Sequence, residues 1–251
     1  TNIGTSLIPV FADIDSDDDM DLFVGNYNGD IIFYRNDGSQ EIMNFVRVGV
    51  LPNVNSQSYS CPSFFDIDSD GDLDLFVGDN SGSILYYNNK GDKFDFNFEH
   101  VSDTFSNINV GSRSSAIFFD IDNDMKSELI IGSYNSDLKM YKQSMNNLEF
   151  NEIECIKIPH IGLNSKPFFY LKNNQVMSLI GISTGGFWST TLRKQSGDIN
   201  SDSNTDINDI ILIVEQIINA NTSVNRCDAD LNFDNHLDLL DIIRLVNKIT
   251  T

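Results

Sequence analysis

The sequence has few of the residues that disulfide frameworks, zinc sites and nucleic-acid interfaces require. It holds only three cysteines and three histidines in 251 residues, and Cys61, Cys155 and Cys227 are scattered without a C-x-x-C pair. This distribution indicates neither a disulfide framework nor a zinc site, and it leaves free thiols or a single disulfide. Only 16 basic residues stand against 37 acidic ones, and the resulting formal net charge of −21 argues against nucleic acid or an anionic membrane surface as a partner.

Long apolar runs are missing as well. No stretch approaches the roughly 18 residues of a transmembrane helix, so we expect no membrane insertion. No signal peptide is present, but the chain begins at Thr1, so we expect a processed or truncated chain and read no compartment from the missing signal. With 40% apolar residues, 18 Phe and 8 Tyr, the chain can still bury a core.

An acidic stretch followed by a short apolar run and a glycine occurs three times. It reads FADIDSDDDMDLFVG at 11–25, FDIDSDGDLDLFVG at 65–78 and FFDIDNDMKSELIIG at 118–132. The first aspartates are Asp13, Asp66 and Asp120, so the repeat length is 53 and then 54 residues, which is typical of propellers and solenoids. A turn and two strand-like segments follow each copy, which predicts about four short strands per unit, as in a propeller blade.

A fourth copy, KPFFYLKNNQVMSLIG at 166–181, has no aspartates and is followed by one more strand candidate but no outer strand. We therefore predict that residues 1–194 are mainly β and form four propeller-type blades, alone or as part of a larger ring. Because the fourth unit stops early, we expect further blades upstream of Thr1 or a strand from a neighbouring chain to complete the ring. In residues 195–251, two aspartate-rich loops offset by 32 residues precede helical apolar periodicity, which predicts a small all-α module.

The acidic loops predict calcium sites. Alternating carboxylates bring several oxygens to one point, and calcium takes about 6–8 oxygen ligands, whereas zinc and copper prefer His or Cys, which the blade loops lack. Five loops hold 23 of the 37 acidic residues, so we predict about five calcium ions. A merely solvated acidic turn is the alternative, and it is disfavoured because the spacing repeats together with its strand context. The predicted blade ligands are Asp13, Asp15, Asp17, Asp21, Asp66, Asp68, Asp70, Asp74, Asp120, Asp122, Asp124 and Glu128.

The sixth position of each blade loop needs a left-handed turn. Gly71 suits it, whereas Asp18 and Met125 suit it less well. Asp72 is expected to act through its carbonyl or as an acid behind the ligands. We expect the third loop, which ends in Glu128, to be the weakest of the three sites.

Both parts resemble known families. The blades resemble FG-GAP/VCBS repeats of integrin-type β-propellers, which implies that each loop joins the first and second strands of a blade. The C-terminal pair resembles a type I-like dockerin, with Ser203 and Asn235 in place of the usual loop glycine. That resemblance implies calcium ligands at Asp198, Asn200, Asp202, Asn204, Asp206, Asp209, Asp230, Asn232, Asp234, His236, Asp238 and Asp241, with Asn204 and His236 acting through their carbonyls. It also implies a cohesin-type partner at Ile207, Asn208, Glu215, Leu239, Leu240 and Asn247, while we expect Val214 and Val246 to be core.

Two functions stay open. The first is a secreted, extracellular or cell-surface, non-catalytic calcium-binding protein, whose propeller recognises a ligand such as a polysaccharide or a neighbouring subunit. The alternative is a dockerin-bearing polysaccharide-degrading enzyme, with a lyase-like propeller or a catalytic part upstream of Thr1. We favour the first, because a lyase needs a Tyr, His or Lys base beside a neutralising cation, and the sequence reveals no such cluster.

Some weaker signals receive structural interpretations. GISTG at 181–185 matches G-x-S-x-G, but its glycines align with the blade turns, so we expect Ser183 not to be a nucleophile. His100 and His160 are expected at the surface or in structural roles, and Trp188 between blades. Asn221 begins a glycosylation sequon.

Overall fold

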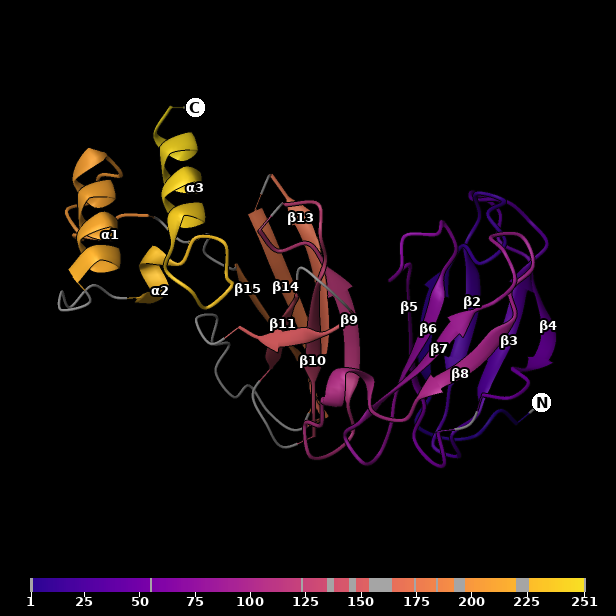
Figure 1. The fold of residues 1–251 in the computed structure, drawn as a ribbon. Helices are drawn as coiled ribbons and strands as arrows, with labels where there is room; N and C mark the ends of the chain where they lie inside the picture. The colour runs from indigo at the N-terminus through magenta and orange to yellow at the C-terminus, as the bar shows by residue number, and fades with distance from the viewer. Residues whose placement is uncertain are drawn as a thin grey trace.

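The chain folds into four antiparallel sheets in a propeller arrangement, followed by a helical unit at the C-terminus (Figure 1). The computed structural model describes residues 2–250 except 55, 123, 135–137, 145–147, 154–163, 174, 184, 192–196 and 220–225. This confirms the predicted fold class. The expected boundary between residues 194 and 195 falls outside the described residues.

Each sheet is a meander whose strands pair in chain order. The first contains β1 (Ile8–Ala12), β2 (Asp21–Gly25), β3 (Ile31–Asn36) and β4 (Phe45–Val50). The second contains β5 (Cys61–Phe65), β6 (Asp74–Gly78), β7 (Ile84–Asn89) and β8 (Phe98–Ser102), and a short 3-10 turn (Phe105–Asn107) follows. The third contains β9 (Ser115–Phe119), β10 (Glu128–Gly132), β11 (Lys139–Gln143) and β12 (Phe150–Glu152). The fourth has three described strands, β13 (Lys166–Lys172), β14 (Gln175–Gly181) and β15 (Phe187–Thr191).

The acidic loops lie where the resemblance implies, between the first and second strands of the first three sheets. The sheets pack face to face through apolar side chains that alternate along each strand. Phe23 and Phe33 of the first sheet meet Tyr87 of the second, and Ile130 of the third sheet meets Ile180 of the fourth. These interfaces hold the loops on a rigid frame.

The fourth sheet shares the backbone geometry of the others although it lacks aspartates. Each inner strand is preceded, two residues earlier, by a residue in the left-handed region: Ser6 (φ 53°), Tyr59 (φ 63°), Arg113 (φ 48°) and Asn164 (φ 58°). Non-glycine residues adopt this conformation only occasionally. Its occurrence at four equivalent positions shows that the degenerate copy is a true blade.

A glycine ends the second strand of every blade and marks where the next blade packs. A Cβ added to Gly25, Gly78 or Gly132 would lie 2.2, 2.3 and 2.3 Å, respectively, from the carbonyl oxygen of the serine that immediately precedes the next sheet's first strand. At Gly181 the nearest described atom outside its own neighbours would be 3.9 Å away, on Lys166 of the same sheet. The third sheet packs on one side of the fourth sheet, but within the described residues no further sheet packs against Gly181 on its other side.

The exposed side of the fourth sheet bears on the prediction that Trp188 packs between blades. Trp188 lies on β15 with 50% of its surface exposed, next to exposed Phe187, so the prediction that it packs between blades is wrong. Trp188 is large and apolar, which favours burial, but the next sheet that would cover it is missing from the described part of the chain.

The helical unit contains α1 (Ile207–Asn219), the short α2 (Arg226–Ala229) and α3 (Leu239–Thr250). Its small core is built around Ile213, Ala229 and Leu245. The expectation that Val246 is core is wrong, because Val246 is 39% exposed, while Val214 is half-buried. None of the described helices is long and apolar enough to cross a membrane.

Candidate metal centres

The five acidic loops share one hydrogen-bonding geometry. In each, the first aspartate accepts hydrogen bonds from the backbone N–H groups of the fourth and fifth residues after it, at 2.9–3.2 Å. These aspartates are Asp13, Asp66, Asp120, Asp198 and Asp230. The sequence folds this way locally because a short side chain can reach the backbone a few residues ahead. The loops therefore curl around one carboxylate whether a strand or a helix follows.

The sixth position is left-handed in all five loops, as the spacing predicts. The φ angles are 69° at Asp18, 94° at Gly71, 68° at Met125, 72° at Ser203 and 61° at Asn235. Four of the five residues are not glycine, so the loop geometry overrides the ordinary preference for glycine there.

The last acid of four loops folds back onto the loop's start. Asp74 and Glu128 accept hydrogen bonds from the N–H groups of Ile67 (3.3 Å) and Ile121 (2.8 Å). In the helical unit Asp209 and Asp241 accept the equivalent bonds from Ile199 and Leu231, each at 2.7 Å. Each loop thus closes around its carboxylates. In the first blade Asp21 instead accepts from the N–H of Asn36 at 2.7 Å.

Three acidic clusters in the blades could hold a metal ion such as calcium. In each cluster, one carboxylate oxygen from each of three residues lies within 4.8 Å of the others. The clusters are Asp13, Asp15 and Asp17; Asp66, Asp68 and Asp70; and Asp120, Asp122 and Glu128. Asp21 and Asp72 are buried, and each leaves a carboxylate oxygen without a hydrogen-bond partner, as expected of acids that face a cation. Oxygen-only donors of this kind fit calcium.

Several carboxyl groups of the loops have raised pKa values, which a nearby positive charge would lower. Burial raises the pKa of Asp21 and Asp74 to about 6, and burial raises the pKa of Glu128 to about 7. In the helical unit, burial and the nearby Asp241 raise the pKa of Asp230 to about 6. A cation among these groups would favour their charged forms and remove the repulsion.

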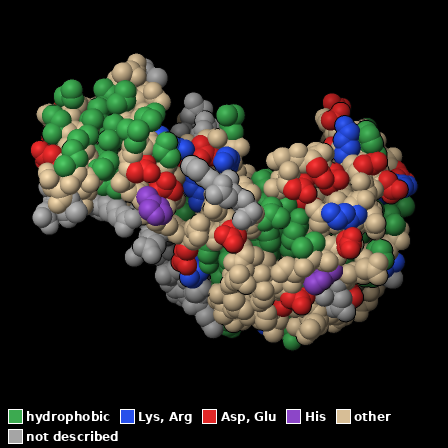
Figure 2. Space-filling model, in the orientation of Figure 1, with side chains coloured by type: hydrophobic (Ala, Val, Ile, Leu, Met, Phe, Trp, Pro, Cys, Tyr) green, Lys and Arg blue, Asp and Glu red, His purple; other side chains and the backbone are tan. Residues whose placement is uncertain are grey.

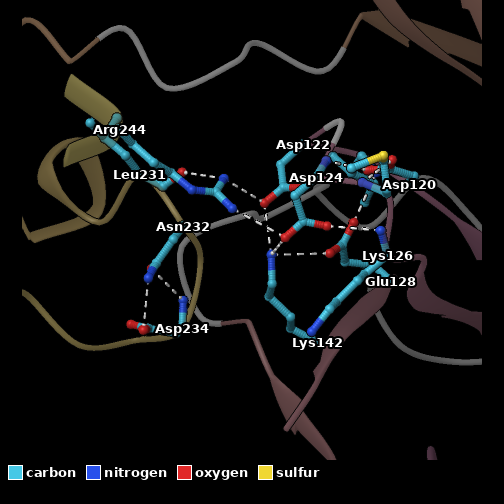
Figure 3. A network of polar contacts seen from close by, with 12 residues as sticks. Asp120, Asp122, Asp124, Lys126, Glu128, Lys142, Leu231, Asn232, Asp234 and Arg244 are labelled. Carbon is cyan, nitrogen blue, oxygen red and sulfur yellow. Dashed lines mark hydrogen bonds and ion pairs between the residues drawn. The ribbon is translucent and has the colours of Figure 1, made fainter. Parts of the chain in front are cut away.

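The third loop differs from the other two because two basic side chains enter it (Figure 3). Lys142 Nζ lies 2.7 Å from Asp122 and 3.0 Å from Asp124, and Arg244 of α3 contacts the same two acids. Burial alone would raise the pKa of Asp124, but the hydrogen bond and charge of Lys142, together with Arg244, lower it. Sequence reasoning missed both cations. Lys142 carried a weak signal, since it replaces Asn88 at the same strand position; Arg244, on a distant helix, carried none.

The ligand positions expected in the helical unit lie in its two loops. Asn200 and Asn232 hydrogen-bond Asp202 and Asp234 at 2.9 and 2.8 Å. The side chain of His236 is 78% exposed, which agrees with a role for its main chain.

All six residues expected to bind a partner are exposed: Ile207, Asn208, Glu215, Leu239, Leu240 and Asn247. Exposed apolar residues extend this set along both helices and include Ile211, Ile218, Ile243 and Val246. In Figure 2 hydrophobic side chains gather over the lobe that α1 and α3 form. Contiguous exposed apolar surface of this kind is typical of interaction sites in general.

A cavity of about 650 Å³ lies at the propeller axis, lined by residues of all four inner strands and the segments before them. Arg113 is placed between the rings of Tyr59 and Tyr134, with Cζ 5.1 and 5.0 Å from the ring centroids. Lys166 Nζ lies 4.8 Å from the centroid of the Tyr59 ring and 3.3 Å from Cys61 Sγ. Sequence reasoning missed this basic and aromatic cluster, because its members come from three different blades.

The remaining sequence signals behave as structural features where they are described. Ser183 lies between β14 and β15, and the next element in the described part of the chain is strand β15, whereas a nucleophile elbow requires a helix after the serine. His100 is at the surface, 2.9 Å from Asp103. Cys61 is a buried free thiol and Cys227 is disulfide-bonded, in agreement with a single disulfide. Cys155, His160 and the sequon at Asn221 lie outside the described residues.

Comparison with protein families supports the reading of the blades. Residues 13–77 and 66–131 each match the FG-GAP-like repeat. Residues 13–131 thus carry FG-GAP-like repeats, and they lie within the propeller arrangement of four sheets. The two overlapping matches cover the three acidic loops of the blades and end before the fourth sheet. No curated protein matches the chain.

Proposed function

We propose that the protein is a secreted, non-catalytic, calcium-stabilised propeller that a C-terminal dockerin-like module attaches to a cohesin-type β-sandwich in an extracellular or cell-surface assembly. One observation carries the proposal: two loops with the same geometry as the blade loops each lead into a helix whose outer face is apolar and exposed. The loops fix where each helix begins, so calcium there would set the docking face. The disulfide at Cys227 supports an oxidising compartment.

The docking face predicts a specific loss of binding. Leu239 is 65% and Leu240 39% exposed at the start of α3. Replacing both by Asp places two charges on the exposed apolar face. We expect binding to a panel of cohesin domains, measured by calorimetry with calcium, to weaken at least about 100-fold, because each substitution removes an apolar contact and leaves a carboxylate without a partner in the interface.

Lys93→Asp is the matched control, since it makes the same change of two charge units at an exposed turn between β7 and β8, far along the chain from the predicted contact residues. Binding that survives the double substitution, or that persists with chelator present, contradicts the proposal.

A second observation favours ligand recognition in the propeller itself. Arg113 and Lys166 concentrate positive charge in the axial cavity of a chain whose net charge is −21, and Tyr59 adds an aromatic surface beside them. This combination suits an anionic sugar, because guanidinium pairs with carboxylate and rings stack on sugar faces. A lyase-like activity, the alternative function, would use the same cavity.

We expect Arg113→Gln to weaken binding of an oligogalacturonate probe about tenfold, the value of one charge-assisted hydrogen bond. Calorimetry measures the binding, with a neutral oligosaccharide as the ligand control and Arg35→Gln as the protein control. Equal binding by wild type and variant excludes the cavity as the site. Release of unsaturated sugar products would instead support the enzyme.

A further inference from the structure

The third acidic loop is approached from two sides by cations of the chain itself (Figure 3). Lys142 comes from β11 of the same blade and contacts three carboxylates, Asp122 at 2.7 Å, Asp124 at 3.0 Å and Glu128 at 3.4 Å. Its side chain is only 14% exposed, and the side chains of Asp122 and Glu128 are 4% and 1% exposed. The ammonium group therefore lies among the ligands that a calcium ion would use.

Arg244 comes from α3 of the helical unit and spans the same two aspartates. Its Nη1 is 3.0 Å from Asp122 and its Nη2 is 3.1 Å from Asp124, while Nη1 also donates to the carbonyl of Leu231 at 3.2 Å. A guanidinium held by two carboxylates and a carbonyl is positioned far better than a mobile surface ion pair.

The acidic loops of the first two blades differ from the third loop in this respect. Register places Arg35 and Asn88 where the third blade has Lys142. Arg35 instead contacts Asp37, at 2.6 Å, and Asn88 donates to Asp68 and Asp74, so no described lysine or arginine contacts the first two clusters.

Two further contacts join the helical unit to the third blade. Phe233, in the second loop of the helical unit, is 6% exposed and packs into the core that the third and fourth sheets share. Asn235 of the same loop donates to the carbonyl of Glu152 on β12 at 2.7 Å. Burial of a phenylalanine and two charge pairs make a specific contact.

We infer that the third blade loop is the docking site of the C-terminal helical module, with Lys142 and Arg244 in the place where the other blade loops bind calcium. The donor set of this loop does not suit an ion once Lys142 is among the carboxylates, because ammonium and calcium repel each other at such distances. The blades therefore hold two calcium ions; the two loops of the helical unit, whose calcium sites rest on the proposed function, bring the total to four.

The docking also makes the two halves of the helical unit unequal. Leu240 and Ile243 of α3 line a groove of about 570 Å³ that the third blade shares through Asp124 and Lys142. Ile207 and Ile211 of α1 do not line this groove and stay exposed. Leu240 and Ile243 nevertheless remain 39% and 46% exposed, so the contact with the third blade leaves this part of α3 accessible to the partner of the proposed function, on which this statement rests.

Counting bound calcium tests the inference. By native mass spectrometry at saturating calcium we expect four ions on the wild type and five on the Lys142→Met, Arg244→Met double variant, in which the third loop is freed. Arg35→Met, at the same strand position in the first blade, is the matched control and should keep four. Five ions on the wild type, or four on a folded double variant, overturns the inference.

Hydrogen exchange in calcium-free protein gives a second measurement that needs no ion. We expect the amides of residues 120–128 and of α3 to exchange at least tenfold faster in Arg244→Met than in wild type, and Arg244→Lys, which keeps the charge, to fall between them. Unchanged exchange in Arg244→Met contradicts docking through this side chain. Because this assay involves no partner, its failure is distinguishable from failure of the proposed cohesin binding.

Discussion

Removing calcium should lower the midpoint of thermal unfolding of the chain by about 10–20 °C. Each blade site filled at about 100 times its dissociation constant adds about 2.7 kcal/mol to the free energy of unfolding. Two blade sites therefore add about 5 kcal/mol, and 1 kcal/mol corresponds to about 2–4 °C in a domain of this size. The effect is large because Asp21 and Asp74 are buried in the folded chain and must otherwise face each loop's repulsion without a counter-charge.

Differential scanning calorimetry with calcium and with a chelator measures this shift. Asp74→Asn should lose the part of the shift that belongs to the second loop, whereas Asp103→Asn, an exposed acid outside the loops, should keep all of it. A melting profile that the chelator leaves unchanged contradicts the prediction.

The pH dependence of stability in the calcium-free protein tests whether the buried carboxylates cause this calcium effect. Burial raises the pKa of Asp21 and Asp74 to about 6, above the value of about 4 for an unfolded aspartate. The folded state then holds protons that the unfolded state has lost, so calcium-free stability falls as pH rises from about 4 to 6. Calcium should reverse that slope, because it binds the charged carboxylates. The calcium-induced shift should therefore be larger at neutral pH than under acid conditions.

Substituting the blade glycines should separate a closed interface from an open one. Gly78→Ala places a Cβ 2.3 Å from the carbonyl oxygen of Ser114. Relieving this clash requires a shift of the backbone of the next blade, so we expect a loss of about 3 kcal/mol in the free energy of unfolding. Gly181→Ala meets only Lys166 Cβ at 3.9 Å and should change stability by less than about 0.5 kcal/mol.

Urea denaturation of the two variants, with light scattering to report the oligomeric state, makes the comparison. If Gly181→Ala is as damaging as Gly78→Ala, then another blade packs on the fourth sheet in solution and covers Phe187 and Trp188. A mass above that of the monomer in the same experiment would assign that blade to a second copy. Equal and small effects of both substitutions would show that the glycines do not mark blade contacts.

The sequence predicts the loops well because their determinants are local. Asp66 bonds backbone groups four and five residues ahead, so the spacing alone reveals the turn. Arg244 and Asp124 are 120 residues apart, and no local pattern connects them. In the helices both faces carry apolar residues, so periodicity could not tell that Leu245 is inside and its neighbour Val246 outside.

The four left-handed residues before the inner strands line the axial cavity without taking part in what holds the propeller together. Ser6, Tyr59, Arg113 and Asn164 all line the axial cavity, and none belongs to a calcium loop or to a strand. Exchanging these four side chains would alter the size, charge and aromatic character of the cavity while the metal ligands and the sheet cores stay as they are. Relatives of this chain could therefore differ in what this cavity accepts while keeping the acidic loops and the sheet cores unchanged.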